Sequence, residues 1–313
     1  MSRATADTAP AIVFLVLYTA VLLVLGYLYA TKAVRWKSRY SFLLFHVVMR
    51  VVGMTLGVAF SCLTWQNGHR VGVLIAYIVF AAEGYFSLIL CVSRFLIVWQ
   101  QDRLGRSNLE PRIPKGTPVR ERLRAVILTP MTGFEYTLIV ANAIIVAGSS
   151  IMAGAITNPD RPDAQQQRDK GKAMRVAGVA IFVALVQVVF AVACRSYRKR
   201  GDRTLALIIL TWPFLTVRGI YGILSVVIAS WSYSNPAAYS VNGFSTSFLV
   251  AEYVMGVAME WVSCMLLLST HFSALNGGKE PVEDHDAQDK DKLALTDRPT
   301  SEAGDVKRKD SEA

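Results

Sequence analysis

TLALIILTWPFLTVRGIYGILSVVIAS, residues 204–230, carries a single charged residue, Arg218, in an otherwise uncharged and mostly apolar run. The run is longer than the roughly 20 residues that an α-helix needs to cross a bilayer. A charge at the centre of such a helix costs roughly 2.5–3.5 kcal/mol, so it is kept where other helices shelter it and a polar group contacts it. The stretch therefore predicts a membrane-spanning helix with one polar, inward-facing side.

Six further stretches have a similar length and composition: residues 11–30, 41–63, 72–99, 134–157, 174–194 and 246–270. The chain has 313 residues, of which 53% are hydrophobic, and this is too apolar for a soluble protein of that size. We therefore predict an all-α, polytopic membrane protein with seven transmembrane helices.

The prediction divides the chain into three parts. Residues 1–10 form a short exterior N-terminus, residues 11–272 form the transmembrane domain, and residues 273–313 form a tail. Beyond Asn276 the composition changes to Gly, Lys, Asp and Glu with almost no aromatic residues. Because such a segment cannot build a core, the tail is predicted to be disordered and cytoplasmic.

Basic residues predict the orientation. The connections after the first, third and fifth spans hold sixteen Lys and Arg residues, against seven in the N-terminus and the other connections. This bias places the N-terminus outside and the C-terminus in the cytoplasm. The connection after the fourth span opposes the rule, with Arg161, Arg168, Lys170, Lys172 and Arg175. The net charge of +10 is therefore a topology signal, and no nucleic-acid partner is expected.

Four more charged residues lie in the middle of predicted spans, away from their ends, namely Arg50, Glu83, Glu252 and Glu260. At a rise of about 1.5 Å per residue, Arg50 and Glu83 come to a similar depth, which predicts an ion pair between them. Arg218 falls between the levels of Glu252 and Glu260, and it is expected to form an ion pair with the last span, which carries both glutamates. Glu260 then has no second arginine to neutralise it, which suits a proton or cation site.

The spacing of these charges also predicts an internal repeat. Arg50 and Glu83 are 33 residues apart, and Arg218 and Glu252 are 34 residues apart. This favours a parallel 3+1+3 repeat with a binding site between the repeats, as occurs in transporters. The alternative is a structural protein in which the salt bridges only lock helix pairs together.

Uncharged polar residues within the spans are expected to support this centre. His46 lies one turn before Arg50 and is expected to act as a hydrogen-bonded spacer. Asn142 is expected to make an interhelical hydrogen bond. Pro213 is expected to kink its helix and open room beside Arg218.

The segment WPFLTVRGIYGILS, residues 212–225, resembles the sixth-helix region of uncharacterised fungal seven-helix integral membrane proteins. In that group a Pro precedes an Arg that is followed by an aromatic residue, here Pro213, Arg218 and Tyr221. The Arg and Glu pattern, with Met259-Glu260 in the last span, is also distantly similar to fungal lipid-translocating exporters, which are associated with resistance to toxic amphiphiles. The resemblance implies a seven-helix fold and a role in lipid movement.

A seven-helix G-protein-coupled-type receptor is an alternative, because the number and orientation of the spans agree. Against it, no acid precedes Ser93-Arg94-Phe95, the last span lacks Asn-Pro-x-x-Tyr, and no exterior cysteine pair occurs. An enzyme is less favoured, because the chain contains no His-x-x-x-His, Gly-x-Ser-x-Gly or Cys-x-x-Cys motif.

We therefore expect a multipass membrane protein that binds or translocates a small amphiphile, a lipid or a proton-coupled solute. Its partners are the lipid bilayer and this ligand, and no cofactor or metal is expected. The predicted polar centre consists of Arg50, Glu83, Arg218, Tyr221, Glu252, Glu260, His46 and Asn142.

Overall fold

The computed structural model describes residues 8–36, 38–62, 69–105, 107, 109–110, 118, 129–157, 162–233, 235–240 and 243–276. The chain divides into two units, Met1–Ser273 and Ala274–Ala313, and all the candidate membrane spans belong to the first. Nearly all of the predicted tail and most of the predicted exterior N-terminus lie outside the described residues.

Seven helices among the described residues are long and apolar enough to cross a membrane, which confirms the predicted all-α polytopic fold. Six of them are α1 (Thr8–Ala30), α2 (Tyr40–Cys62), α3 (His69–Leu104), α5 (Pro130–Thr157), α6 (Ala164–Lys199) and α7 (Arg203–Val227). The seventh is composite, with α8 (Thr246–Val250), a π-helical segment η3 (Ala251–Ala258) and α9 (Met259–Asn276).

The connection between α7 and α8 contains short elements only. Two 3-10 turns, η1 (Ala229–Trp231) and η2 (Pro236–Ala238), precede an antiparallel pair of two-residue strands. The strands are β1 (Tyr239–Ser240) and β2 (Gly243–Phe244), and Tyr239 pairs with Phe244.

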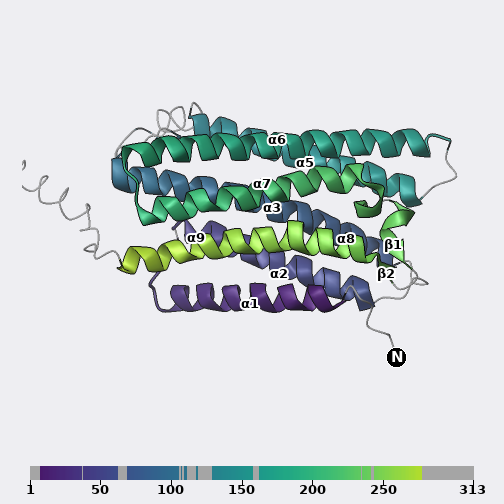
Figure 1. Cartoon of the computed structure of the whole chain (residues 1–313), viewed down its shortest axis with the longest axis horizontal. Coiled ribbons are helices and arrows are strands. Elements are labelled where there is room, and N and C mark those ends of the chain that lie inside the picture. The colour runs from purple at the N-terminus through teal and green to yellow at the C-terminus, as the bar shows by residue number, and fades with distance from the viewer. Residues whose placement is uncertain are drawn as a thin grey trace, which may run out of the picture. The chain divides into compact units, whose positions relative to one another are not determined.

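The helices pack side by side, and α3 is central. Figure 1 shows α1 and α2 on one side and α5 and α6 on the other, with α3, α7 and the composite helix between them. Helix α3 packs against α2, α5, α6 and α7, and η3 packs against α7. Side chains that α3, α7 and the composite helix direct inward are therefore sheltered from lipid.

Helix α6 is longer than the sequence predicts. It has 36 residues, a length of about 54 Å, whereas the hydrocarbon layer is about 30 Å thick. It begins at Ala164, before the predicted start at residue 174, because hydropathy marks only the part of a helix that lies in hydrocarbon. Arg168, Lys170 and Lys172, which the sequence places in a connection, therefore belong to α6. Arg175, counted with the same basic connection although it lies at the edge of the predicted span, belongs to α6 as well.

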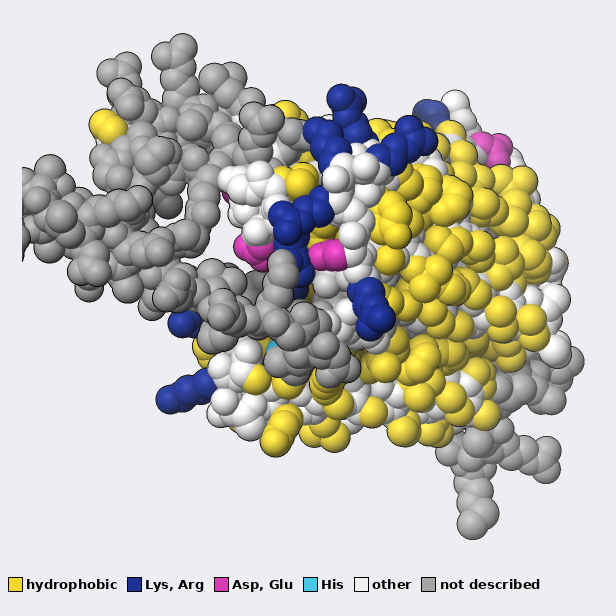
Figure 2. Space-filling view, turned by 60° about the vertical axis from the view of Figure 1, so that its left-hand side comes forward, with side chains coloured by type: hydrophobic (Ala, Val, Ile, Leu, Met, Phe, Trp, Pro, Cys, Tyr) yellow, Lys and Arg dark blue, Asp and Glu magenta, His cyan; other side chains and the backbone are white. Residues whose placement is uncertain are grey.

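Basic side chains gather at one end of the bundle. Figure 2 shows a group of Lys and Arg side chains beside a broad apolar flank. At the end where α6 stops and α7 begins, the exposed residues include Arg195, Arg198, Lys199, Arg200 and Arg203. This basic end is the one that the orientation rule assigns to the cytoplasm, and the orientation itself stays a prediction.

Glycines bring α5 and α6 into close contact. A Cβ atom at Gly178 would stand 2.8 Å from the carbonyl oxygen of Ala141, and one at Gly171 would stand 2.7 Å from that of Gly148. Small residues at such positions let membrane helices approach closely. Gly171 and Gly178 flank Arg175, so this contact also fixes where the Arg175 backbone lies.

Candidate functional site

Three charged residues from three helices meet in the interior. Nε of Arg218 on α7 donates to Oε1 of Glu260 on α9 at 2.5 Å. Nε of Arg50 on α2 lies 2.9 Å from Oε2 of the same carboxylate. The second contact is an ion pair without hydrogen-bond geometry. Arg50, Arg218 and Glu260 together form the charge cluster.

The charge cluster corrects one prediction. The sequence predicts that Glu260 lacks a second arginine, but this carboxylate contacts two. Glu260 is 0% exposed and Arg50 is 1% exposed, so neither can exchange its partner for bulk water. A buried carboxylate that already bridges two guanidinium groups is a poor site for a further cation.

Tight packing on α3 surrounds the charge cluster. A Cβ atom at Gly84 would stand 2.7 Å from Cδ of Arg50 and 3.0 Å from Oε2 of Glu260, so only glycine leaves room there. Cζ of Arg218 lies 5.3 Å from the ring centre of Tyr85 and 5.7 Å from that of Tyr221, within cation–π range.

Neutral donors hold Glu252. The Tyr221 hydroxyl donates to Oε2 at 2.5 Å, and the Tyr77 hydroxyl donates to Oε1 at 3.3 Å. Among the described residues no Arg or Lys nitrogen lies within 4.0 Å of this carboxylate. Of the two glutamates predicted to face Arg218, Glu260 therefore pairs with it and Glu252 does not. Glu252 is 5% exposed. The charge cluster holds two arginines and one glutamate and so has one positive charge in excess. The carboxylate of Glu252 balances this charge without contacting either arginine.

Glu83 also has a neutral partner. Nδ2 of Asn142 on α5 donates to its Oε1 at 2.5 Å, which confirms the interhelical hydrogen bond predicted for Asn142. The predicted Arg50–Glu83 pair is wrong, because Arg50 turns toward the composite helix and Glu83 turns toward α5.

His46 is fully buried beside the charge cluster. Its Nδ1 lies 2.9 Å from the Ser87 hydroxyl, and its Nε2 has no hydrogen-bond partner among the described residues. The Tyr18 ring packs edge-on at 6.3 Å. This fits the predicted spacer between α2 and α3, since no carboxylate contacts the ring in the described part of the chain.

A polar cavity of about 50 Å³ adjoins the charge cluster between α3, α5, α6, α7 and η3. This volume is room for a few water molecules or for one compact polar group. Its charged and aromatic polar lining residues are Arg175, Arg218, Glu252, Tyr85, Tyr221 and Tyr233.

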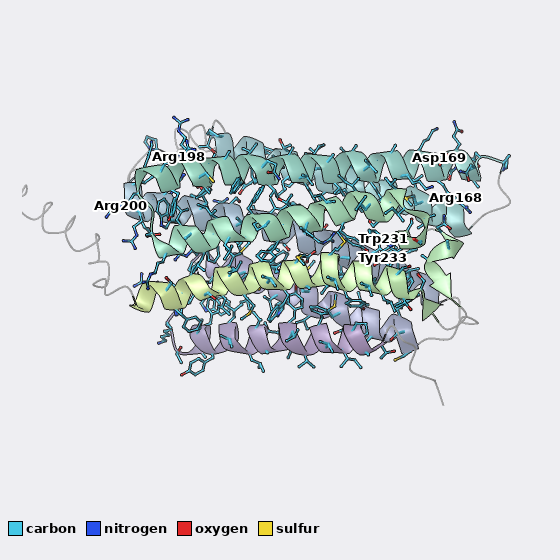
Figure 3. The ribbon with its side chains drawn as sticks, in the orientation of Figure 1. Arg168, Asp169, Arg198, Arg200, Trp231 and Tyr233 are labelled. Carbon is cyan, nitrogen blue, oxygen red and sulfur yellow. The ribbon has the colours of Figure 1, made fainter. Side chains whose placement is uncertain are left out.

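The cavity lies toward the end opposite the basic end. Figure 3 shows Tyr233 and Trp231 at the same end as Arg168 and Asp169, while Arg198 and Arg200 lie at the other end. Since Tyr233 lines the cavity, the predicted orientation places the cavity in the outer half of the bundle.

Arg175 is the site residue that sequence reasoning missed. It makes no hydrogen bond or ion pair with any described residue, and its Nε is buried. It lies close enough to Arg218 and Glu252 to interact electrostatically with both. The signal was present, because Arg175 falls inside the predicted span 174–194.

An apolar pocket continues along the same three helices. Its lining side chains come from α3, α6 and α7, among them Ile89, Val186, Ala193, Ile208, Trp212 and Leu215. On each helix these residues lie beyond those that line the polar cavity, in the direction of the basic end.

Tyr85 and Phe182 lie on the side of the polar cavity that is nearer to the apolar pocket, one helical turn before the pocket's lining residues Ile89 and Val186. Their rings pack edge-on with centres 5.7 Å apart, and both side chains line the polar cavity. The Tyr85 hydroxyl donates to the carbonyl oxygen of Leu215, which lines the apolar pocket, at 3.0 Å. A Cβ atom at Gly219 would stand 2.6 Å from that hydroxyl, so Gly219 provides the space for this bond.

Comparison with known protein families, with curated proteins and with solved structures gave no match. The similarity to fungal seven-helix proteins and lipid-translocating exporters therefore stays a prediction. No group of three or more His, Cys, Asp or Glu side chains within the described ranges could hold a metal ion.

Proposed function

We propose that this membrane protein binds a small amphiphile or lipid inside its bundle and moves it along α3, α6 and α7. The observation that carries the proposal is the succession of a polar cavity and an apolar pocket on the same three helices. An amphiphile has these two parts in the same order. Its polar head would lie beside Arg175 and Arg218, and its chain would extend past Tyr85 toward Trp212.

The two spaces together are long enough for a path across the membrane. On α7, lining residues run from Ser225 in the polar cavity to Ile208 in the apolar pocket. At 1.5 Å per residue this distance is about 26 Å, most of the roughly 30 Å thickness of the hydrocarbon layer.

Movement along this path requires the Tyr85–Phe182 pair to open. The hydrogen bond from Tyr85 to Leu215 holds the pair closed. Pro213 lies inside α7 beside the lining residues Trp212 and Leu215, and its missing N–H group weakens the helix there. We therefore place the moving part of α7 at Pro213.

A proton-coupled version of this function assigns the proton to Glu252. Glu260 is engaged by two arginines, whereas Glu252 lines the cavity and is held by tyrosine hydroxyls. Protonation of Glu252 would change the charge of the cavity without breaking an ion pair of the described residues.

The test is transport of fluorescent single-chain amphiphiles in liposomes that contain the purified full chain. Val186→Phe fills the apolar pocket, since Val186 lines it and is 4% exposed. Val188→Phe is the matched control on the same helix, because Val188 is 53% exposed on the outer side. We expect Val186→Phe to slow transport at least tenfold and Val188→Phe to leave it unchanged.

Two results would overturn the proposal. One is a folded Val186→Phe variant, monodisperse by size-exclusion chromatography, that transports every probe at the unmodified rate. The other is a protein that moves no probe faster than empty liposomes. Tight probe binding without movement would instead favour the receptor alternative.

A further inference from the structure

The polar cavity has unused hydrogen-bond donors. Arg218 uses Nε on Glu260 and Nη2 on the Ala81 carbonyl oxygen, and no bond from its Nη1 is found within the described ranges. The Arg175 guanidinium has no partner in the same part of the chain. Both side chains line the cavity.

Both carboxylate oxygens in the cavity lining already accept a hydrogen bond. Tyr221 and Tyr77 each donate to one oxygen of Glu252. Two guanidinium groups and one carboxylate leave the cavity lining with one surplus positive charge. A cationic head would therefore meet two arginines and one carboxylate, each of whose oxygens already accepts a hydrogen bond.

We propose that the polar cavity is a binding site for one compact anionic head, such as a phosphate, sulfonate or carboxylate, carried on an apolar chain. A guanidinium group binds such an oxyanion through two parallel N–H···O bonds, which Arg175 is free to make. The anion also neutralises a cation that is otherwise unpaired near the membrane interior. This inference rests on the proposed function, because the chain of the ligand enters the apolar pocket, whose volume of about 20 Å³ has to widen to take it.

The size of the cavity sets the class of head. A volume of about 50 Å³ accepts a group of a few heavy atoms but leaves little room for a sugar or a large zwitterion. Tyr85 and Phe182 lie where the head joins the chain, so the chain continues past two aromatic rings. The preferred ligand is therefore a single-chain amphiphile with a small anionic end.

The experiment measures binding to the full chain in nanodiscs of neutral lipid. The probes are dodecyl phosphate, dodecyl sulfate, dodecanoate, dodecyltrimethylammonium and dodecyl maltoside, and inorganic phosphate serves as a probe without a chain. We expect the anionic probes to bind at least tenfold more tightly than the cationic and sugar probes. Inorganic phosphate is expected to bind weakly, since it gains nothing from the apolar pocket.

Variants locate the effect at Arg175. Arg175→Gln is expected to weaken binding of dodecyl phosphate roughly tenfold to a hundredfold, because charge-assisted hydrogen bonds are lost. Arg175→Lys keeps the charge and is expected to recover part of this loss. Arg168→Gln is the matched control, since Arg168 lies about two turns away on α6 and donates to the Ala155 carbonyl oxygen.

The outcomes separate this inference from the proposed function. Equal binding of cationic and anionic probes, or no effect of Arg175→Gln, would overturn the anionic head and leave amphiphile binding in place. Inorganic phosphate that binds as tightly as dodecyl phosphate would keep the oxyanion site and overturn the amphiphile. No binding of any probe would overturn both.

Discussion

Glu260→Gln is expected to destabilise the protein strongly, because Glu260 is the shared partner of Arg50 and Arg218. The amide oxygen of Gln can still accept one hydrogen bond, but the negative charge is lost. Two guanidinium groups then remain in the interior, with exposures of 1% for Arg50 and 8% for Arg218.

The magnitude depends on the burial of this pair. Breaking a buried ion pair by removing one partner costs about 3–5 kcal/mol, against a total stability of about 5–15 kcal/mol for a typical domain. At about 2–4 °C per kcal/mol for chains of this size, the fall in apparent Tm is roughly 6–20 °C. The expected loss is that of one broken pair and not of two, since the amide keeps part of the contact with Arg218.

Thermal unfolding in detergent, monitored by size-exclusion chromatography of a fluorescently tagged chain, measures this change. The matched control is Glu83→Gln, the same substitution at a half-buried residue whose partner is the neutral Asn142. A Gln at this position can still accept from Asn142, so its cost is expected to be about 1 kcal/mol or less. In the Glu260→Gln background, Arg50→Met removes the surplus cation and is expected to raise the apparent Tm.

Two results would refute a coupled charge cluster. In the first, Glu260→Gln and Glu83→Gln lower the apparent Tm by the same amount. In the second, Arg50→Met lowers the apparent Tm of the Glu260→Gln variant as much as it lowers that of the unmodified chain. Either result would mean that Arg50, Arg218 and Glu260 do not act as a unit.

Three further predictions concern packing, hydrogen bonding and orientation. Gly84→Ala is expected to cost about 1–3 kcal/mol in the same thermal assay, because the new Cβ would stand 2.7 Å from an arginine side chain of the charge cluster. Gly26→Ala, where nothing lies within 4 Å, is expected to be neutral or stabilising, and equal losses at both sites would contradict this. Tyr221→Phe is expected to cost about 1.5–3 kcal/mol, more than Tyr77→Phe, because its bond to Glu252 is 2.5 Å and that of Tyr77 is 3.3 Å; the reverse order would be inconsistent with the geometry. An epitope tag at the C-terminus of the chain in cells is expected to bind antibody only after permeabilisation, and staining of intact cells would reverse the predicted orientation.

The seven spans could be predicted from the sequence because hydrocarbon thickness imposes a minimum length on every apolar helix. The presence of a sheltered charge cluster could be predicted as well, since Arg50, Arg218 and Glu260 cannot face lipid without a large cost. Both predictions need only the length of an apolar stretch and the position of a charged residue along it, and both can be read directly from the sequence.

The pairing of the charges could not be predicted in the same way. Depth places Arg50 level with Glu83, but it does not say which neighbour each side chain faces. Arg175 was missed because it lies at the very edge of the predicted span and was counted with the basic connection before it, whereas α6 begins about three turns earlier, at Ala164. A further ion pair, Arg94 with Glu135, joins α3 to α5 and was not predicted, although both residues fall within predicted spans.

The parallel 3+1+3 repeat stays a prediction, with one structural parallel beside it. Arg50 and Arg218, the arginines that the repeat relates, contact the same carboxylate. Glu83 and Glu252, the acids that it relates, each accept from neutral donors. The residues that the spacing relates, Arg50 with Arg218 and Glu83 with Glu252, therefore also have partners of the same kind.

The π-helical segment Ala251–Ala258 changes the angular phase of the last span. A π turn holds about one residue more than an α turn, and one residue corresponds to a rotation of about 100° in an α-helix. A helical wheel drawn from Thr246 to Asn276 therefore cannot give the directions of both Glu252 and Glu260. When this span is aligned with a regular α-helical one, a one-residue gap inside 251–258 is needed to keep both carboxylates in register.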